Sequence, residues 1–362
     1  MTPEEADARR LRLESLSRAG GPLTSRSPQA SVSNPEWYGS DGRATPARAE
    51  LHKRLLNEYE AESPEVPQNR QAVIIVGPPG AGKSSVRDDI MKDTGTTPAQ
   101  WRHLDPDDFR DRLAGAMRAD GSLNQVVPPE AADLRPTPRE LSSQLFVESA
   151  KLTQAAQKDA ITRGDNLMIE GAYADEKRLG DLVKSLEKQG YDVQLATVDV
   201  SPQDAQERAE QRYRDGASRA AEPGAQGKEA LGGRFVPAES LAGHFDEEGR
   251  PKATGAAQAV AAQRPGVQSV RQYSVSAADQ PARLQSVAQR QGGMQQLDAQ
   301  TYKSARAAGM MQALPSTQLS TQPSAGRQGG QGRGGQGAGQ GERPEHRQRQ
   351  QQQGGPKHTL DR

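Results

Sequence analysis

Several features common in proteins are missing from this sequence of 362 residues, and each absence excludes a class of protein or site. There is no cysteine, which excludes disulfide bonds and cysteine-ligated zinc sites. Lysine plus arginine number 47, as do aspartate plus glutamate, so the net charge of zero gives no whole-chain signal for nucleic acid or an anionic membrane. The five histidines are scattered without the spacing of metal ligands.

Targeting signals are missing as well. No apolar run approaches the length of about 18 residues that a membrane-spanning helix needs. The segment from Met1 to Gly21 is charged and has no apolar stretch of the kind found in signal peptides. We therefore expect a cytoplasmic protein that makes no contact with a membrane.

Apolar residues are scarce and unevenly distributed. Hydrophobic residues make up 33% of the chain and aromatic residues 4%, too little to give every residue a packed core. Strand-like apolar runs occur only between about Gln71 and Tyr273. The sequence therefore predicts a disordered segment at residues 1–48, a folded domain at 49–285 and a low-complexity tail of mainly Gly, Gln and Arg at 286–362. The arginines of the tail lack aromatic neighbours for base stacking, which favours a solvated tail over RNA contact.

The most informative segment is the apolar run 72–76 followed by GPPGAGKS, which fits the phosphate-binding P-loop pattern G-x-x-x-x-G-K-S. Its glycines let backbone N–H groups surround phosphate oxygens, and the following helix directs its partial positive charge at the same phosphates. We expect Lys83 to reach the β- and γ-phosphates of a nucleoside triphosphate and the Ser84 hydroxyl to ligate Mg²⁺. The predicted phosphate-binding residues are Gly77, Pro78, Pro79, Gly80, Ala81, Gly82, Lys83, Ser84 and Ser85.

Predicted strands and helices alternate around this motif. The expected strands are 72–76, 101–104, 167–170 and 193–200, and the expected helices are 49–60, 85–94, one ending near 117, 139–163, 175–189 and 202–214. Such alternation is typical of a parallel sheet covered by helices on both faces. The predicted fold class is therefore α/β, a P-loop NTPase-like parallel sheet flanked by disordered N- and C-terminal segments. Ligands of such sheets bind at the carboxyl ends of the strands.

Acidic residues follow two of the predicted strands. Asp105, Asp107 and Asp108 come after the second strand. We expect one of them to face the P-loop and accept the proton of an attacking hydroxyl, although all three could instead cap the next helix. Glu170 ends another strand and precedes Gly171. It could hold a magnesium-bound water or, if protonated, donate a hydrogen bond to a loop.

Arginines follow the last strands. The predicted helix 202–214 carries Arg208, Arg212 and Arg214, and Arg234 follows a turn formed by two glycines. An arginine beyond the sheet is in the expected position for a clamp on the transferring phosphate. Each of them could also be a solvated surface residue.

Taken in order, these elements resemble the zeta toxin family, kinases of UDP-N-acetylglucosamine. The P-loop, the D-x-D-x-F motif of residues 105–109, the apolar-E-G run of 167–171, the V-x-P and R-Y ends of 200–213, and the R-x-x-P of 234–237 all match the family pattern. The resemblance implies ATP and Mg²⁺ as cofactors and a small helical antitoxin that occludes the ATP site. It also implies that Asp107 is the catalytic base, that Arg212 and Arg234 grip the ATP phosphates beside Lys83, and that Glu170 lies in the nucleotide site. Residues 270–273 resemble the terminal strand of the family domain.

The chain departs from the family pattern on the side of the sugar nucleotide. After Glu170 and Gly171 the family usually has a small hydroxyl residue and then an arginine, whereas this chain has Ala172, Tyr173 and Ala174. The primary hypothesis is a kinase that phosphorylates a hydroxyl of UDP-N-acetylglucosamine. The alternatives are a P-loop kinase for another small acceptor, such as an antibiotic or a nucleotide, and an ATP-binding scaffold with little turnover.

Overall fold

The structure is a computed structural model that describes residues 2–311. The segment 312–362, which includes most of the predicted low-complexity tail, lies outside the described residues. The predictions of a flexible tail and of no RNA contact by its arginines therefore stay predictions. Within residues 2–311, no helix combines the length and the apolar composition needed to cross a bilayer.

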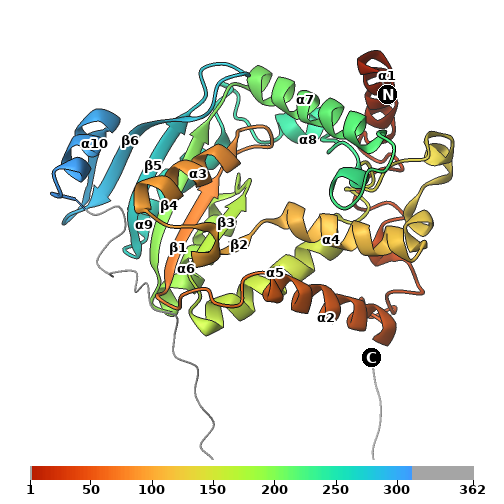
Figure 1. Ribbon diagram of the computed structural model, residues 1–362, viewed down its shortest axis with the longest axis horizontal. Helices are drawn as coiled ribbons and strands as arrows, with labels where there is room; N and C mark the ends of the chain where they lie inside the picture. Colours follow the sequence, from red (N-terminus) through yellow and green to blue (C-terminus); the bar gives the residue numbers. More distant parts are fainter. Residues whose placement is uncertain (1, 312–362) are drawn as a thin grey trace, which may run out of the picture. The chain divides into compact units, whose positions relative to one another are not determined.

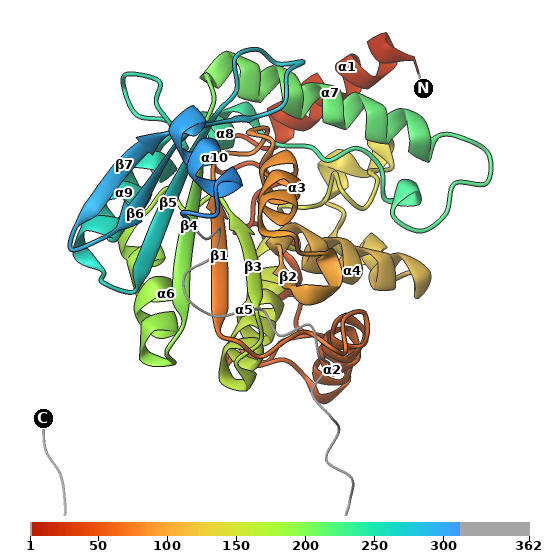
Figure 2. The ribbon, with the colours of Figure 1, turned by 60° about the vertical axis from the view of Figure 1, so that its left-hand side comes forward.

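A single seven-stranded sheet organises the described residues, and Figure 2 shows its strands in the order β2-β3-β1-β4-β5-β6-β7. The strands β2, β3, β1, β4 and β5 run parallel to their neighbours, while β6 and β7 are antiparallel. In chain order they are β1 (Gln71–Val76), β2 (Arg102–Leu104), β3 (Leu167–Gly171), β4 (Asp192–Asp199), β5 (Val267–Ser274), β6 (Arg283–Arg290) and β7 (Met294–Asp298). The parallel α/β sheet predicted from the sequence is confirmed.

The continuous apolar run of β1 is explained by its central position, where both of its faces are buried. Ile74 lies between Ile169 of β3 and Leu195 of β4, and all three contribute to one hydrophobic cluster. Its neighbour Ile75 points to the opposite face and joins a second cluster with Ile90. The sheet therefore has a buried core on each side, as a fold with helices on both faces requires.

Helices cover both faces of the sheet. Side chains of α5, α6 and α9 belong to the first cluster, whereas α3, α8 and the start of α7 belong to the second. The helices are α1 (Pro3–Leu16), α2 (Pro46–Ala61), α3 (Lys83–Thr94), α4 (Pro106–Ala119), α5 (Phe146–Arg163), α6 (Glu176–Lys188), α7 (Pro202–Ala220), α8 (Ala238–Ala242), α9 (Lys252–Gln263) and α10 (Ala299–Ala307). Short 3₁₀ turns lie between them at Ser31–Ser33 (η1), Pro98–Gln100 (η2), Ser122–Val126 (η3), Pro129–Leu134 (η4) and Glu229–Leu231 (η5).

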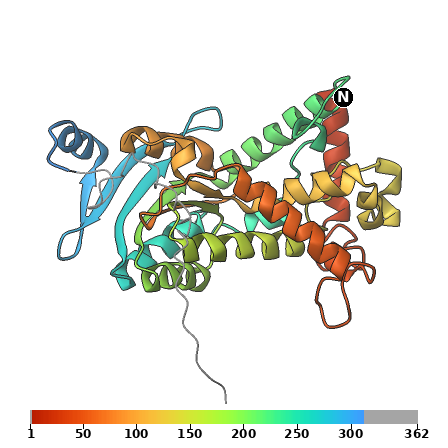
Figure 3. The same cartoon turned by 60° about the horizontal axis from the view of Figure 1, so that its bottom comes forward.

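The predicted disorder of residues 1–48 is wrong for the part that the structure describes. Helix α1 begins with a capping box between Thr2 and Glu5 and lies beside α7 in Figures 1 and 3. Leu13 and Leu23 are almost fully buried. The segment is polar because much of its attachment is ionic: Arg48, for example, makes a two-point ion pair with buried Glu148 of α5. A count of apolar residues does not reveal partners that are 100 positions away.

The predicted domain end at residue 285 is also wrong, because β6, β7 and α10 continue the fold to residue 307. These strands are rich in glutamine, and Val287 is the most deeply buried side chain among them. They were missed because their alternation of apolar and polar residues is weak. Helix α10 is fixed by buried Tyr302, whose hydroxyl donates to Asp93 of α3 at 2.8 Å.

The predicted helix 139–163 is shorter than expected, because regular helix begins only at Phe146. Residues 138–145 form turns instead. In this stretch Arg139 bonds to Asp111 of α4 and Glu140 bonds to Arg9 of α1. These long-range ion pairs hold a conformation that the local helical pattern does not predict.

A chain trimmed to residues 49–285 is expected to lose stability. Removing residues 2–48 removes Leu13 and Leu23 and exposes the apolar surface that they cover. Full burial of one such side chain stabilises the folded state by roughly 1.5–3 kcal/mol. Thermal unfolding followed by circular dichroism should therefore show a clearly lowered Tm or no cooperative transition. A chain trimmed only to residues 2–311 is the control and should unfold like the full chain. Equal Tm values for all three chains would contradict the packing of the N-terminal segment.

Candidate active site

The P-loop joins β1 to α3 in a conformation that only glycine tolerates at two positions. Gly80 and Gly82 have φ angles of 82° and 84°, in the left-handed region. A Cβ atom on Gly80 would also lie 2.2 Å from the carbonyl oxygen of Ala205. Gly82 is the N-cap of α3 and provides no side-chain cap, so the first N–H groups of the helix are available to an anion. This is the strand–loop–helix arrangement that a P-loop requires.

Lys83 and Ser84 occupy the first turn of α3. The Lys83 ammonium donates to the carbonyl oxygens of Gly77 at 3.0 Å and Pro78 at 3.2 Å, so the side chain lies back over the loop. Burial lowers the pKa of Lys83, and the nearby carboxylates of Glu170, Asp105 and Asp107 oppose that shift.

The Ser84 hydroxyl is exposed and makes no hydrogen bond within residues 2–311. It is therefore available as an oxygen ligand, and the residues present fit a nucleotide with its Mg²⁺. Ser85 differs, because its hydroxyl donates to the carbonyl oxygen of Gly82 at 2.8 Å and so stabilises the loop.

The three aspartates after β2 have different roles. Asp105 is the N-cap of α4 and accepts a hydrogen bond from the backbone N–H of Asp107 at 2.9 Å. Asp108 pairs with Arg112 and Lys228, away from the other two. One aspartate can therefore cap the helix while another is catalytic: Asp105 is the cap, and Asp107 faces Arg110 and Arg234.

Asp107 is the centre of a group of positive charges. Its carboxylate accepts hydrogen bonds from Arg110 at 2.9 Å and from Arg234. Burial alone would raise the pKa of Asp107, but the charges of Arg234, Arg110, Arg212 and Lys83 lower it to about 2. The carboxylate is therefore ionised throughout the neutral range and available as a hydrogen-bond acceptor.

Arg234 and Arg212 both lie near the Asp107 carboxylate, but they differ in burial and in hydrogen bonding. Arg234 is mostly buried and forks between two carboxylates, donating to Asp107 and, at 2.9 Å, to Asp111. Arg212 projects from α7 with an exposed side chain and has no hydrogen bond within the described part of the chain. Even at this exposed position, partial desolvation of the guanidinium and repulsion by Arg234 lower the pKa of Arg212, and attraction to Asp107 opposes this. In the structure, Lys83, Arg212 and Arg234 all lie close enough to Asp107 for their charges to lower its pKa.

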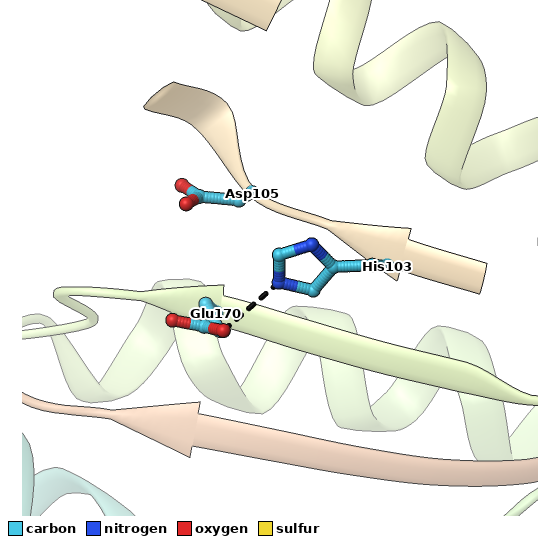
Figure 4. A group of neighbouring side chains, drawn as sticks. All are labelled: His103, Asp105 and Glu170. Atoms are coloured by element: carbon cyan, nitrogen blue, oxygen red, sulfur yellow. Dashed lines mark hydrogen bonds and ion pairs between the residues drawn. The ribbon is translucent and has the colours of Figure 1, made fainter. Parts of the chain in front are cut away.

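Glu170 is the second-last residue of β3, the strand between β1 and β2. It accepts hydrogen bonds from Arg87 of α3 at 3.1 Å and from the His103 ring at 2.9 Å. Figure 4 shows His103 pointing at Glu170, with Asp105 at the end of β2 close by. One ligand atom from each of these three residues lies within 4.8 Å of the others, so the group could hold a divalent cation. A cation there would compete with Arg87 for the Glu170 carboxylate.

Several polar residues of the site were missed by the sequence analysis. Arg110, Asp111 and Arg139 surround Asp107 and Arg234, with Arg139 donating to Asp111 at 2.7 Å. Arg110 and Asp111 lie within one turn of Asp107 on α4, so the helical period could have indicated them. Arg139 has no such local signal, because it reaches the site from a turn.

Replacing Arg234 by lysine is expected to impair phosphate handling, although the charge is kept. The guanidinium fork can keep its bond to Asp111 while it donates to a phosphate, and a single ammonium cannot make both bonds in the same geometry. A hydrogen bond to a charged group is worth roughly 1.5–3 kcal/mol, which corresponds to a loss of about 10-fold or more in kcat/KM. The exposed Arg250 offers a matched control, Arg250→Lys, which should leave the steady-state rate unchanged. An Arg234→Lys variant with normal kcat/KM would exclude the clamp.

The fold and this site define a P-loop protein of the kinase-like class: a parallel sheet, a phosphate loop, and acidic and arginine side chains at the carboxyl ends of the strands. The family model described as zeta toxin matches residues 56–264, more than half of the chain. The protein therefore belongs to the zeta toxin family of P-loop kinase-like toxins, as the resemblance of its motifs indicated.

Solved structures give distant likenesses. One is a chain from the PezAT chromosomal toxin–antitoxin system of Streptococcus pneumoniae, 15% identical, covering 66% of this chain and 80% of that chain with a TM-score of 0.42. Another is from the AvrRxo1-ORF1:AvrRxo1-ORF2 structure with sulphate ions, 14% identical, covering 73% and 74% with a TM-score of 0.47. A structure of AvrRxo1-ORF1:-ORF2 with ATP is 12% identical, covering 78% and 77% with a TM-score of 0.43. The curated proteins gave no match. Likenesses at this level carry no inference about function.

Proposed function

We propose that the protein is an ATP-dependent kinase that transfers the γ-phosphoryl group of ATP to a hydroxyl of UDP-N-acetylglucosamine. The observation that carries the proposal is the position of Asp107: an ionised carboxylate whose pKa is lowered by the charges of three arginines and of the P-loop lysine. In the reaction, an acceptor oxygen bonds to the γ-phosphorus as the bond between that phosphorus and the β–γ bridging oxygen breaks. The hydroxyl proton passes to the Asp107 carboxylate, and ADP leaves.

The chain's own residues divide this work among themselves. Asp107 orients the acceptor hydroxyl by accepting its hydrogen bond and then takes up its proton. Lys83 leaves the carbonyl oxygens of Gly77 and Pro78 to bind the β- and γ-phosphate oxygens. Arg212 and Arg234 stabilise the charge on the transferring group. In this scheme Arg234 releases Asp107 as it turns to the phosphates, and the loss of that ion pair raises the basicity of Asp107 when the substrate is bound.

Ser84 and Glu170 are the residues that would hold Mg²⁺, Ser84 directly and Glu170 through a water. The ion would neutralise phosphate charge and orient the phosphates. Glu170 also fixes the position of Arg87, whose guanidinium it binds at 3.1 Å.

The choice of acceptor rests on family membership. The replacement of the usual hydroxyl residue and arginine by Ala172, Tyr173 and Ala174 is the observation that favours a different small acceptor, such as an antibiotic or another nucleotide. Tyr173 has a φ angle of 40°, which is unusual for a residue other than glycine, and its ring packs over Gly171 at the end of β3. An ATP-binding scaffold is the further alternative, and an acceptor-dependent turnover of ATP distinguishes the two kinases from it.

We also propose that the protein acts in the cytoplasm, where both nucleotide substrates occur, and that a small helical antitoxin neutralises it by covering the ATP site. Expression in a bacterial host tests the toxic activity. Growth should stop when the wild-type chain is induced and continue when the Asp107→Asn variant is induced at the same level. Arrest by both would show that the toxicity does not depend on phosphoryl transfer.

A further inference from the structure

We propose that Arg9 of helix α1 is a positioning residue for Arg234, so that the N-terminal segment is a working part of the active site. Arg9 lies outside residues 56–264, where the family model matches. The inference rests on the proposed function in one respect, the contact between Arg234 and the phosphates of ATP.

Arg9 neutralises one deeply buried carboxylate. Its guanidinium donates to both oxygens of Glu140, at 2.6 and 2.7 Å, and the Glu140 side chain is 1% exposed. It also donates to the carbonyl oxygens of Leu134 at 2.7 Å and Arg135 at 3.1 Å. A two-point pair of this kind fixes orientation as well as charge. Arg9 therefore holds the turn of residues 134–140 against α1.

Glu140 in turn binds the turn at Thr137 and helix α7 at Tyr213. It accepts a hydrogen bond from the backbone N–H of Thr137 at 2.7 Å and from the hydroxyl of Tyr213 on α7 at 2.7 Å. Burial and the charge of Glu140 raise the pKa of Tyr213, so the hydroxyl remains a donor. One buried carboxylate thus sets the distance between the turn and α7.

The two residues before Arg234, Gly232 and Gly233, pass between Thr137 and Tyr213, the two residues that Glu140 binds. A Cβ atom on Gly232 would lie 2.2 Å from the Thr137 side chain, and one on Gly233 would lie 2.1 Å from the carbonyl oxygen of Tyr213. Both glycines are buried, and their lack of side chains lets the segment fit. The next residue is Arg234, so the width of this gap determines where its guanidinium can reach.

Arg139 adds a direct connection from the same turn. Its backbone N–H donates to the carbonyl oxygen of Leu231 at 2.9 Å, and its guanidinium donates to the carbonyl oxygen of Gly232 at 3.1 Å. That guanidinium also pairs with Asp111, the second carboxylate bound by Arg234. A shift of the turn would therefore move both the backbone before Arg234 and one of its partners.

The experiment is a double-mutant cycle on nucleotide affinity, which needs no knowledge of the acceptor. Isothermal titration of the full chain with AMP-PNP and Mg²⁺ gives the Kd of the wild type, Arg9→Ala, Arg234→Ala and the double variant. We expect Arg234→Ala to weaken binding roughly 10-fold and Arg9→Ala roughly 5-fold, but Arg9→Ala to cost less than about 2-fold when Arg234 is already absent. The control is Arg12→Ala, an exposed residue of the same helix, which should match the wild type.

Equal losses from Arg9→Ala in both backgrounds, or no loss at all, would overturn the proposal. If Arg9→Ala fails to fold, Tyr213→Phe takes its place in the cycle, because it removes only one hydroxyl from Glu140. Failure of the proposed function looks different: the wild type then does not bind AMP-PNP, or Arg234→Ala binds it normally. In that case amide hydrogen exchange tests the positioning role of Arg9 without any nucleotide. Arg9→Ala should raise the exchange rate at the amides of residues 231–235 and leave the rate in β1 unchanged. Faster exchange throughout the chain, or none at 231–235, would contradict a positioning role.

Discussion

Replacing Lys83 by alanine is expected to lower phosphoryl transfer on the order of 10²-fold or more, since one preorganised cation on the transferring phosphate is worth several kcal/mol in the transition state. Lys83 is the only lysine of the P-loop, and its ammonium is already held over that loop by Gly77 and Pro78. The effect should appear in kcat as well as in the Kd for ATP, because the negative charge on the phosphates changes during the reaction.

Steady-state kinetics with a coupled ADP assay provides the measurement. Lys92→Ala, an exposed position on the same helix, is the matched control and should keep the wild-type rate. The melting temperature of each variant shows whether the loop itself is disturbed. A Lys83→Ala protein that turns over ATP at the wild-type rate would exclude the assignment of the P-loop as the ATP site.

The second large effect is expected at Asp107. Asparagine keeps the shape of the side chain but cannot accept the hydroxyl proton, and loss of a general base is worth about 10²–10⁴-fold in rate. Because Asp107→Asn also removes the charge that pairs with Arg234, the freed guanidinium should bind the phosphates at least as well as before. We therefore expect kcat to fall while the affinity for ATP is kept or improved.

Asp105→Asn is the informative comparison for this prediction. Asn is as good an N-cap as Asp, so the start of α4 should be preserved and the loss of rate should be much smaller. Single-turnover rates at saturating ATP separate the two variants most clearly. Equal damage from both would indicate a structural or metal-binding role for the cluster in place of a base at Asp107.

The parts of the fold that could be predicted are those whose signal is local. The apolar run of β1 and the glycine pattern of the P-loop lie within 14 consecutive residues, Gln71–Ser84, and the structure confirms both. The phosphate end of the site follows from this short segment, because a central parallel strand and its loop are defined by neighbours in sequence.

The site around Asp107 could be predicted only in part. Arg234 is 127 residues away from Asp107, and nothing in the local sequence of either residue reveals that they pair. The roles predicted for Asp107 and Arg234 follow instead from the order of motifs that this chain shares with the family. Arg139 lies in a turn outside every motif used, so it was missed, although it binds the same Asp111 as Arg234.

The ends of the domain were placed wrongly for a physical reason. Low apolar content predicts disorder when the chain has nothing else to hold it, but α1 is attached by ion pairs, such as that between Arg9 and buried Glu140. At the other end, buried Arg271 of β5 pairs with half-buried Asp93 of α3, which also accepts a hydrogen bond from the hydroxyl of Tyr302 of α10. Composition counts these polar residues as evidence against a core, whereas here they help to build one.

The central claim is that the protein transfers a phosphoryl group from ATP to a small acceptor, with UDP-N-acetylglucosamine as the proposed one. The most direct measurement is to incubate the purified full chain with ATP, Mg²⁺ and a panel of sugar nucleotides, nucleotides and aminoglycosides, and to analyse the products by mass spectrometry. The expected result is one added phosphoryl group on UDP-N-acetylglucosamine, formed together with ADP and absent with Asp107→Asn. Phosphorylation of a different member of the panel would contradict the proposed acceptor, and no phosphorylated product at all from a chain that binds ATP would contradict the kinase itself.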